Sequence, residues 1–488
     1  MSSHRTARVL VYTHRWLGIV GGILFVIWFV SGIVMMYARM PALETSERLS
    51  RLPAISPESI RVAPPAPADG DIARLVINTV ETRPVYRITA KGRTQSIFAD
   101  TGDAVPVVDA EQAMRIARAF DDSHHALRYD ARLTDADQWS FGVRGRMPLH
   151  RVAVEDDAGT VLYVTESTGE VVLKTTASGR LWGGAGAVMH WLYFTPFRRL
   201  SNVWAQSIIW LSVAGTLMCI VGMVWGLWRF APMRGYRLRD HRQWSPYASW
   251  MRWHHYAGLI FGIVSTTWIF SGLLSMDPWD WHPSTAPTRE QRQLISGGPI
   301  VAADLSVETV RRVLKGYAPS WPKEVEIVRF RGHYFASSAA GLVSFEEPQF
   351  GVRDQLPADQ MVGAANLVMP GIAIDGMSWL DQYDSYYYDR SGRLSLPVLR
   401  VRYSDPQHTW LYFDPRHGVI ARKEERLSRL NRWLYHGFHS LDFPFLYYHR
   451  PLWDIVVIVL SIGGIVLSVT TLTASWRRLK RHANNLWT

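Results

Sequence analysis

The chain has 488 residues, of which 48% are hydrophobic and 19% are charged, and it contains 22 Trp and a single Cys. This composition excludes a disordered protein, a collagen-like fibre and a scaffold held by intrachain disulfides. The formal net charge is +11, and its meaning depends on where along the chain the basic residues lie.

Four windows of the sequence, each at least 20 residues long, contain no Asp, Glu, Lys or Arg. At a rise of 1.5 Å per residue, a helix of this length covers the roughly 30 Å hydrocarbon core of a bilayer. Buried helices of soluble proteins are usually shorter and carry a polar face. The windows therefore predict four transmembrane helices, at residues 16–38, 203–228, 256–276 and 455–475.

The positive charge lies in three short segments, residues 1–15, 229–255 and 476–488. Together they hold 13 of the 53 Lys and Arg residues and one of the 42 Asp and Glu residues. The remainder holds 40 basic and 41 acidic residues and is close to neutral. Basic residues beside membrane spans mark the cytoplasmic side and contact anionic lipid. We therefore expect cytoplasmic termini and no nucleic-acid partner.

This topology gives an ordered set of segments along the chain. The first span is interpreted as an uncleaved anchor, because its apolar stretch is long and no small-x-small cleavage site follows it. Two near-neutral segments of domain size face outward, and each ends in a short apolar stretch that we interpret as an interfacial helix, at 181–197 and 433–449. The predicted segments are 1–38 (cytoplasmic N-terminus and first span), 39–202 (outer), 203–228 (span), 229–255 (cytoplasmic loop), 256–276 (span), 277–452 (outer), 455–475 (span) and 476–488 (cytoplasmic tail).

Both outer segments have the pattern of small α+β domains. In the first, residues 109–120 predict a helix, and short strands are expected at 85–88, 95–99, 138–143, 151–155, 161–165 and 170–173. In the second, residues 306–314 predict a helix, and strands are expected at 324–330, 334–337, 410–413 and 419–422.

An internal repeat relates the two halves of the chain. A shift of 240 residues aligns the first span with the third without a gap, and eight of 24 positions are identical, among them His14 with His254. A shift of 249 residues aligns the second span with the fourth and His190 with His439. Since paired spans cross the membrane in the same direction, we expect parallel repeats related by a pseudo-two-fold axis along the membrane normal. Equivalent side chains can meet on that axis.

Two strand-turn-strand motifs, "YVTESTGEVV" and "LYFDPRHGVI", each precede an apolar segment with histidine, "VMHWLYF" and "WLYHGFHSLDFPF". The motifs "THRWLGIVGGILFVIWFVSGIVMMY" and "WHHYAGLIFGIVSTTWIFSGLL" open the two halves. In these motifs, which are spread over almost its whole length, the sequence resembles the PepSY-associated transmembrane family. His417 stands where the turn of this family more often has Thr.

The resemblance implies two periplasmic PepSY-like domains on a bacterial inner-membrane protein. Some members of the family are iron-regulated siderophore reductases that bind two b-type haems, so the resemblance also implies haem b and a ferric siderophore or other ferric chelate as the oxidant. The chain has no C-x-x-C-H motif for covalent haem and no flavin or nicotinamide motif. An external electron donor, a quinol or a cytoplasmic reductase, is therefore expected.

The four repeat-related histidines are the candidate axial ligands of haem iron. His14 and His254 lie at the inner ends of paired spans, and His190 and His439 lie at the outer ends. Two imidazoles on one haem iron leave no open position, which suits electron transfer. A single histidine at a helix end is more often an interfacial residue, but four at equivalent positions favour ligation. His255 and His436 remain rival ligands or hydrogen-bonding partners behind them.

Several other features have two interpretations. The repeated glycines of the first and third spans allow close approach of a flat macrocycle or of another helix. Six arginines near span ends could contact haem propionates or anchor the helices at the interface: Arg15, Arg252, Arg198, Arg199, Arg432 and Arg450.

The spans and the paired histidines, together with the activity that the family resemblance implies, favour a four-span protein that carries electrons from the inner histidine pair to the outer pair and reduces a ferric complex. Two alternatives stay open at this stage. The outer domains could be a sensor or a protease-regulating module on a plain membrane anchor, or the protein could be a siderophore transport component without redox activity.

Overall fold

The computed structural model describes residues 2–122, 124–238, 241–348, 351–390 and 392–486. The chain forms two compact units. A helical unit contains Met1–Met40, Gly179–His282 and Leu430–Thr488, and an α+β unit contains Pro41–Ser178 and Pro283–Arg429. Arg239 and Asp240 of the predicted basic loop lie outside the described residues.

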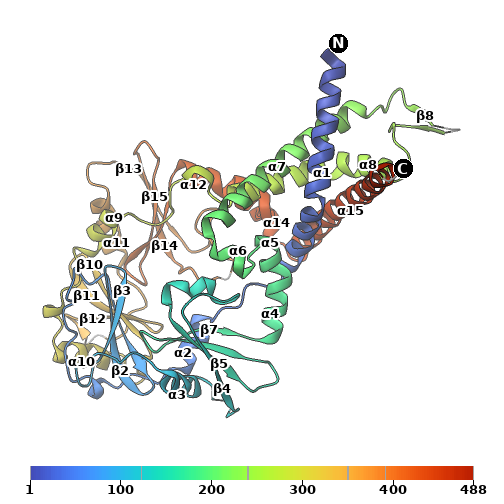
Figure 1. Ribbon diagram of the computed structural model, residues 1–488. Helices are drawn as coiled ribbons and strands as arrows, with labels where there is room; N and C mark the ends of the chain where they lie inside the picture. The colour runs from blue at the N-terminus through green and yellow to red at the C-terminus, as the bar shows by residue number, and fades with distance from the viewer. Residues whose placement is uncertain (1, 123, 239–240, 349–350, 391, 487–488) are drawn as a thin grey trace. The chain divides into compact units, whose positions relative to one another are not determined.

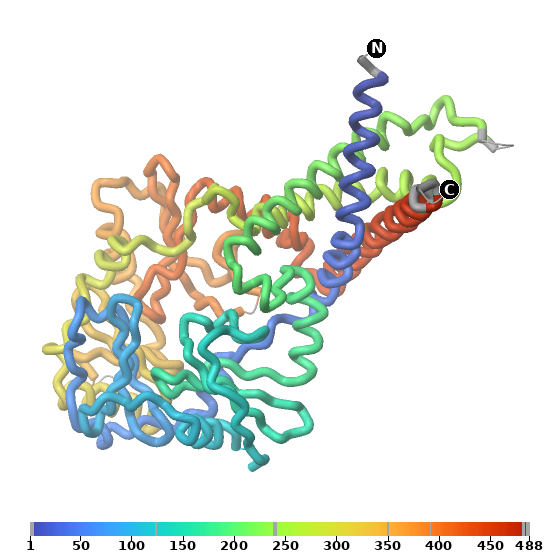
Figure 2. The backbone as a smooth tube through the Cα atoms, viewed as in Figure 1, coloured from blue at the N-terminus to red at the C-terminus, as the bar shows by residue number. Residues whose placement is uncertain are grey.

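Four long helices dominate the helical unit, and all four are long and apolar enough to cross a membrane. They are α1 (Ser2–Met35), α7 (Ser201–Arg229), α8 (Trp250–Leu274) and α15 (Leu452–Leu486). Helix α1 packs against α7 and α15, and α8 packs against the same two helices. The first and last helices of the chain, blue and red, lie side by side in Figure 2. The prediction of four apolar helices is confirmed.

The helices extend beyond the apolar windows of the sequence. Helix α15 includes Asp454, whose carboxylate accepts hydrogen bonds from Arg450 at 2.7 Å and from Tyr37 at 3.1 Å. Helix α8 begins six residues before the predicted span and so contains His254 and His255. Charge-free windows locate the hydrocarbon core, but charged and interfacial residues continue a helix as readily as apolar ones.

The two predicted interfacial segments are short, broken helices. The first consists of α4 (Ala177–Gly183), a π-helical turn (Gly184–Val188), α5 (Met189–Trp191) and α6 (Thr195–Arg199). The second consists of α12 (Arg426–Asn431), a π-helical turn (Arg432–Gly437), α13 (Phe438–Ser440) and α14 (Pro444–Tyr447). Leu192 and Leu441, which lie 249 residues apart, both adopt left-handed backbone conformations, with φ of 51° and 50°, and turn the chain after α5 and α13. The strands β8 (Tyr236–Leu238) and β9 (His241–Gln243) form a hairpin between α7 and α8.

A six-stranded antiparallel sheet joins the two sequence segments of the α+β unit (Figure 1). Its strand order is β12-β11-β10-β1-β2-β3, and Leu75 of β1 pairs with Ile327 of β10. The strands are β1 (Arg74–Val80), β2 (Arg83–Ala90), β3 (Arg93–Phe98), β10 (Val325–Phe330), β11 (His333–Ser338) and β12 (Gly341–Ser344).

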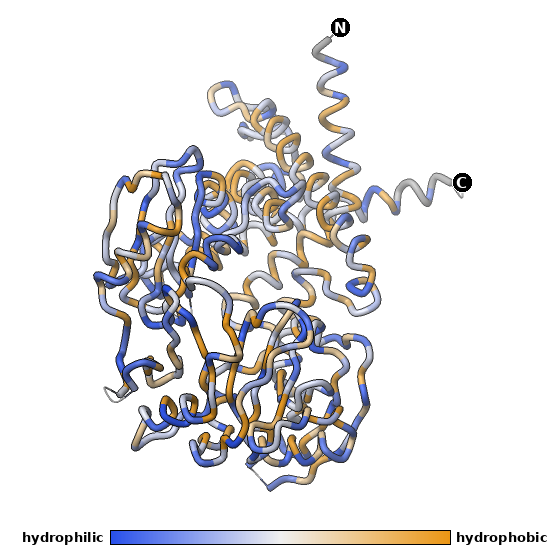
Figure 3. The backbone as a smooth tube through the Cα atoms, turned by 90° about the vertical axis from the view of Figure 1, so that its left-hand side faces the viewer, coloured by the Kyte–Doolittle hydropathy of each residue, from blue (hydrophilic) through white to orange (hydrophobic). Residues whose placement is uncertain are grey.

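Each segment also has a four-stranded antiparallel sheet of its own. The first contains β4 (Leu127–Leu133), β5 (Leu149–Val154), β6 (Val161–Thr165) and β7 (Val171–Thr175). The second contains β13 (Ile374–Leu380), β14 (Val398–Tyr403), β15 (Trp410–Asp414) and β16 (Val419–Glu424). Central strands of the α+β unit are mostly orange in Figure 3, and many of its loops are blue, as expected for strands that bury apolar side chains.

The helices of the α+β unit place their apolar faces on these sheets. Helix α3 (Ala110–Phe120) lies in a core with β5 and β6, and α11 (Ala358–Val368) lies in an equivalent core with β14 and β15. Helix α10 (Val307–Lys315) covers the six-stranded sheet. The unit also contains α2 (Thr45–Arg51) and α9 (Arg289–Ser296).

Most of the predicted α+β elements are present, and one is wrong. Residues 138–143 were expected to form a strand, but Ser140–Arg146 is a 3-10 helix. The Asp137 carboxylate accepts from the backbone N–H groups of Trp139 and Ser140 and stabilises this turn. The sequence patterns do not predict strands β1, β4, β12, β13 and β14 or helices α2, α9 and α11.

A chain of hydrogen bonds, partly exposed at Arg48 and Glu324 and buried at Arg87, connects the two segments beside the β1–β10 pairing. Arg48 donates to Glu324 at 2.8 and 2.7 Å, and Asn78 donates to the same carboxylate at 3.0 Å. Arg87, which is 5% exposed, donates from Nε to Asn78 Oδ1 at 2.8 Å and lies 3.3 Å from Glu170. Arg87 also donates to Ser96 Oγ and to the carbonyl oxygen of Thr168, and Glu170 supplies the counter-charge that a buried guanidinium needs.

The same network sets the ionisation of Glu170. Burial alone would raise its pKa, but the positive charges of Arg87, Arg146 and Arg48 lower the pKa of this carboxyl below its ordinary value. A carboxyl with a lowered pKa in the folded state stabilises the fold at neutral pH. That contribution is lost as the pH falls through the range between the unfolded and folded pKa values.

We predict that Glu170→Gln lowers the stability of the α+β unit at pH 7 by roughly 3 kcal/mol or more, because it leaves the Arg87 guanidinium buried without its counter-charge. The variant should also show a weaker loss of stability below pH 4.5 than the unmodified protein. Thermal unfolding in detergent, with hydrogen exchange of β1, β2 and β7 as the local measurement, checks both effects. Glu111→Gln is the control, since Glu111 is exposed and pairs with Arg115 on the surface. Equal behaviour of the two variants would contradict the role of Glu170.

Candidate functional site

Within the helical unit, the structure brings His14 and His254 together. Their ring centroids lie 6.0 Å apart, with 41° between the ring planes. His14 is on α1 and His254 is on α8, the two long helices that sit opposite one another across the bundle. We call them the inner pair.

The same separation occurs between His190 and His439. Their ring centroids are also 6.0 Å apart, and their planes are inclined by 72°. Both residues lie on short helices that follow π-helical turns, α5 and α13. We call them the outer pair. All four histidines selected by the repeat therefore face their repeat-related partners.

Each imidazole of the inner pair is anchored through Nδ1. His14 Nδ1 donates to the carbonyl oxygen of Met218 at 3.0 Å, and His254 Nδ1 lies 3.1 Å from Thr470 Oγ1 and 3.3 Å from Thr471 Oγ1. A proton on Nδ1 leaves the lone pair on Nε2, the arrangement that orients an imidazole for metal binding.

The outer pair is anchored in the same way on both sides. His190 Nδ1 lies 3.1 Å from Ser31 Oγ, and His439 Nδ1 lies 3.1 Å from Ser271 Oγ. Ser31 and Ser271 are 240 residues apart, as the first and third helices are in the repeat. His439 Nδ1 also lies 3.2 Å from the carbonyl oxygen of Trp268.

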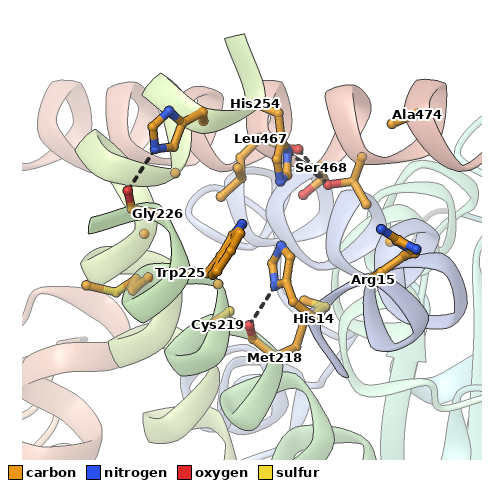
Figure 4. Close-up of a pocket in the computed structure, with 18 of the residues that line it drawn as sticks. His14, Arg15, Met218, Cys219, Trp225, Gly226, His254, Leu467, Ser468 and Ala474 are labelled. Carbon is orange, nitrogen blue, oxygen red and sulfur yellow. Dashed lines mark hydrogen bonds between the residues drawn. The ribbon is translucent and has the colours of Figure 1, made fainter. Parts of the chain in front are cut away.

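A cavity of about 260 Å³ contains the inner pair (Figure 4). Figure 4 shows His14 and His254 projecting from separate helices into the same space, with Arg15 at its side. Six glycines from three helices form part of its wall: Gly18, Gly22, Gly222, Gly226, Gly258 and Gly262. A Cβ atom at position 222 would lie only 2.6 Å from His14 Nδ1, so this position must be glycine for the ring to occupy its place. The cavity wall is therefore shaped around the imidazole.

Aromatic side chains occupy the bundle between the two pairs. Phe25 lines the inner cavity, and its ring centroid is 5.9 Å from that of Trp28 and 6.4 Å from that of Phe29. Trp28 Nε1 donates to the carbonyl oxygen of His190 at 2.9 Å. The interior between the pairs is therefore packed and apolar.

The two rival histidines have different surroundings. His255 is 6% exposed, and its two ring nitrogens bond to Ser245 Oγ and to the carbonyl oxygen of Gly226, both at 2.8 Å. His255 thus links the loop after β9 to the end of α7 through two hydrogen bonds, which is a structural role. His436 lies against Tyr435, with centroids 4.4 Å apart, while the ring that faces His190 is that of His439.

Sequence reasoning found the four imidazoles but missed the groups that anchor them. Ser31 and Ser271 are identical in the repeat alignment, and that identity was available as a signal. The anchor at Met218 is a backbone carbonyl oxygen, which every residue has, so no residue type in the sequence could indicate it. Among the described residues, no group of three or more His, Cys, Asp and Glu side chains is placed to hold a metal ion.

The four membrane-compatible helices and the α+β sheets define a membrane protein with a helical and an α+β unit and with imidazoles paired inside the bundle. The chain belongs to the family of the PepSY-associated TM region, whose model matches residues 11–478. A search of curated proteins finds no match.

We predict that Gly222→Ala destabilises the helical unit by about 1–3 kcal/mol, because the new methyl group collides with the His14 ring and forces the ring or α7 to move. Gly226→Ala, one turn further along α7, is the matched control. A Cβ there meets Leu259 and His255 no closer than 3.6 Å, which is ordinary contact. Thermal unfolding of both variants in the same detergent checks this expectation, and equal midpoints would show that the wall at Gly222 is not shaped by His14.

Proposed function

We propose that this protein is a b-type haem protein of the bacterial inner membrane that passes electrons outward and reduces a ferric complex, such as a ferric siderophore. The observation that carries the proposal is the arrangement of four imidazoles as two facing pairs, each ring held through Nδ1.

The residues of each pair fit this cofactor. A metal–imidazole bond is about 2 Å long, so two rings that share one ion have centroids about 6 Å apart, and both pairs have 6.0 Å. Two imidazoles are the number of protein ligands in a six-coordinate bis-histidine haem. The glycines around the inner pair provide a wall without side chains, against which a flat macrocycle can pack.

The chain's own residues have defined tasks in this proposal. The Nδ1 hydrogen bonds of His14, His254, His190 and His439 fix the orientation of the rings and increase the basicity of Nε2. His14 and Ser31 are 17 residues apart on α1, so the two pairs lie at levels separated by about 26 Å along that helix. Haem, when bound, supplies reversible one-electron chemistry.

The substrate class follows from the expected outward direction of the electrons. A hard oxygen-donor chelator binds Fe(III) strongly, and one-electron reduction to Fe(II) lowers the charge on the iron and weakens the complex. In this proposal the α+β unit docks the oxidant, and the electrons come from a quinol or a cytoplasmic reductase.

Haem content gives the first test. The purified protein should be red, with a b-type Soret band that shifts on addition of dithionite and about two haems per chain. His14→Ala or His254→Ala should remove one haem, and His190→Ala or His439→Ala should remove the other, because each variant loses one of two axial ligands. His333→Ala is the control, because His333 lies on the surface of the α+β unit beside Glu346. Colourless protein from haem-replete cells would refute the proposal and favour a sensor or transport component.

Reductase activity is a separate prediction. Protein reduced with dithionite and freed of excess reductant should be reoxidised by a ferric chelate, with about one Fe(II) formed per haem. The Soret band follows reoxidation, and a ferrous-specific chelator follows Fe(II). A variant without either pair, His14→Ala with His190→Ala, is the control and should form no Fe(II). If the haem stays reduced in the presence of every ferric chelate, the reductase activity is refuted, and the protein would be a haem protein with another oxidant.

A further inference from the structure

Two arginines reach the cavity of the inner pair from different helices. Arg15 follows His14 directly on α1, and Arg478 lies near the end of α15. Thr471, Ala474 and Arg478 all line the cavity and are spaced by three and four residues, so they form one stripe on α15. Thr471 is also a neighbour of His254 Nδ1. The described residues that line the cavity include no Asp or Glu.

Neither guanidinium has a carboxylate partner within 4.0 Å among the described residues, and the guanidinium of Arg15 lies over the ring of Tyr12. Two other arginines of the helical unit have carboxylate partners: Arg450 pairs with Asp454 at 2.7 Å, and Arg432 lies 3.5 Å from Asp442. The cavity therefore combines a largely apolar wall, three imidazoles, those of His14, His254 and His255, and two positive charges that have no acidic partner among the described residues.

We propose that Arg15 and Arg478 form a carboxylate clamp, which holds the two propionate groups of the tetrapyrrole bound between His14 and His254. The clamp rests on the proposed haem function and adds the orientation of the ligand, with its anionic edge toward the basic end of the bundle. Guanidinium groups suit this task because their fork of N–H donors matches a carboxylate and because they remain charged at all relevant pH values.

The test compares haemin with haemin dimethyl ester, in which both propionates are esterified. Full-length protein with His190→Ala, made without haem and kept in detergent, offers the inner site alone. Haemin should bind it at least about tenfold more tightly than the ester does, since each charged hydrogen bond is lost in the ester. The double variant Arg15→Gln with Arg478→Gln should lose this preference and bind both compounds with the affinity of the ester.

The matched control is Arg8→Gln with Arg477→Gln. It removes the same charge from the same two helices, at positions that do not line the cavity, and it should keep the preference for haemin. Binding of the ester to the double variant shows that its site is folded. Equal affinity of the unmodified site for haemin and ester overturns the clamp and leaves the haem function in place. If neither compound binds the unmodified site, the clamp and the proposed haem function fail together.

Discussion

The hydrogen bond from Nδ1 of each histidine to a neighbouring helix or turn is the interaction on which the candidate site depends. An imidazole that projects freely into a cavity samples several orientations, whereas one that is bonded at Nδ1 presents Nε2 in a fixed direction. In the outer pair the anchors are Ser31 and Ser271, and in the inner pair they are a carbonyl oxygen and two threonine hydroxyls. The inner and outer pairs thus have the same ring separation, although different groups anchor their imidazoles.

The α+β unit is less symmetric than the bundle. Arg87, Asn78 and Glu170 form a buried polar network in the first half, while the positions 249 residues later are occupied by Ala336, Ile327 and Val419. Ala336 and Ile327 belong to an apolar core. A buried ion pair contributes little net stability compared with such a core but requires one specific arrangement of its partners. The polar network lies where the two halves meet, and it links Glu324, next to β10, with β1 and β2.

Much of the helical unit could be predicted from the sequence because its determinants are local and periodic. Charge-free windows predicted the four long helices, and the two repeat shifts selected the four histidines that the structure places in pairs. The helix ends were less predictable. Arg478 lines the cavity because α15 continues past residue 475, where the apolar window ends. Hydropathy alone does not predict this continuation of the helix. The periplasmic domains, the haem and its ligands stay predictions.

In the α+β unit, the missed elements depended on non-local contacts. Helix α11 has Pro357 at its N-cap and no capping side chain. Helix α3 instead has Asp109 as its N-cap, and the Asp109 side chain accepts a hydrogen bond from the backbone N–H of Gln112. The 249-residue shift would have placed α3 almost directly on α11. Strand β1 has residues buried on both faces, so it lacks the alternation by which the other strands were recognised. Residues 138–143 alternate like a strand, but the Asp137 carboxylate stabilises a tight turn instead.

The pairing of β1 with β10 has a consequence for how the protein is made. Leu75 and Ile327 are partners in the sheet although about 250 residues separate them. Ribosomes add about 5–20 residues per second, so β10 is synthesised roughly 12–50 s after β1, and during this time one edge of β1 has no pairing partner. During that interval the nascent first half has an unpaired edge strand, whose free backbone N–H and C=O groups can pair with other chains. The six-stranded sheet can therefore be completed only after β10 has been synthesised, and until then its open edge has to be kept from pairing with other chains.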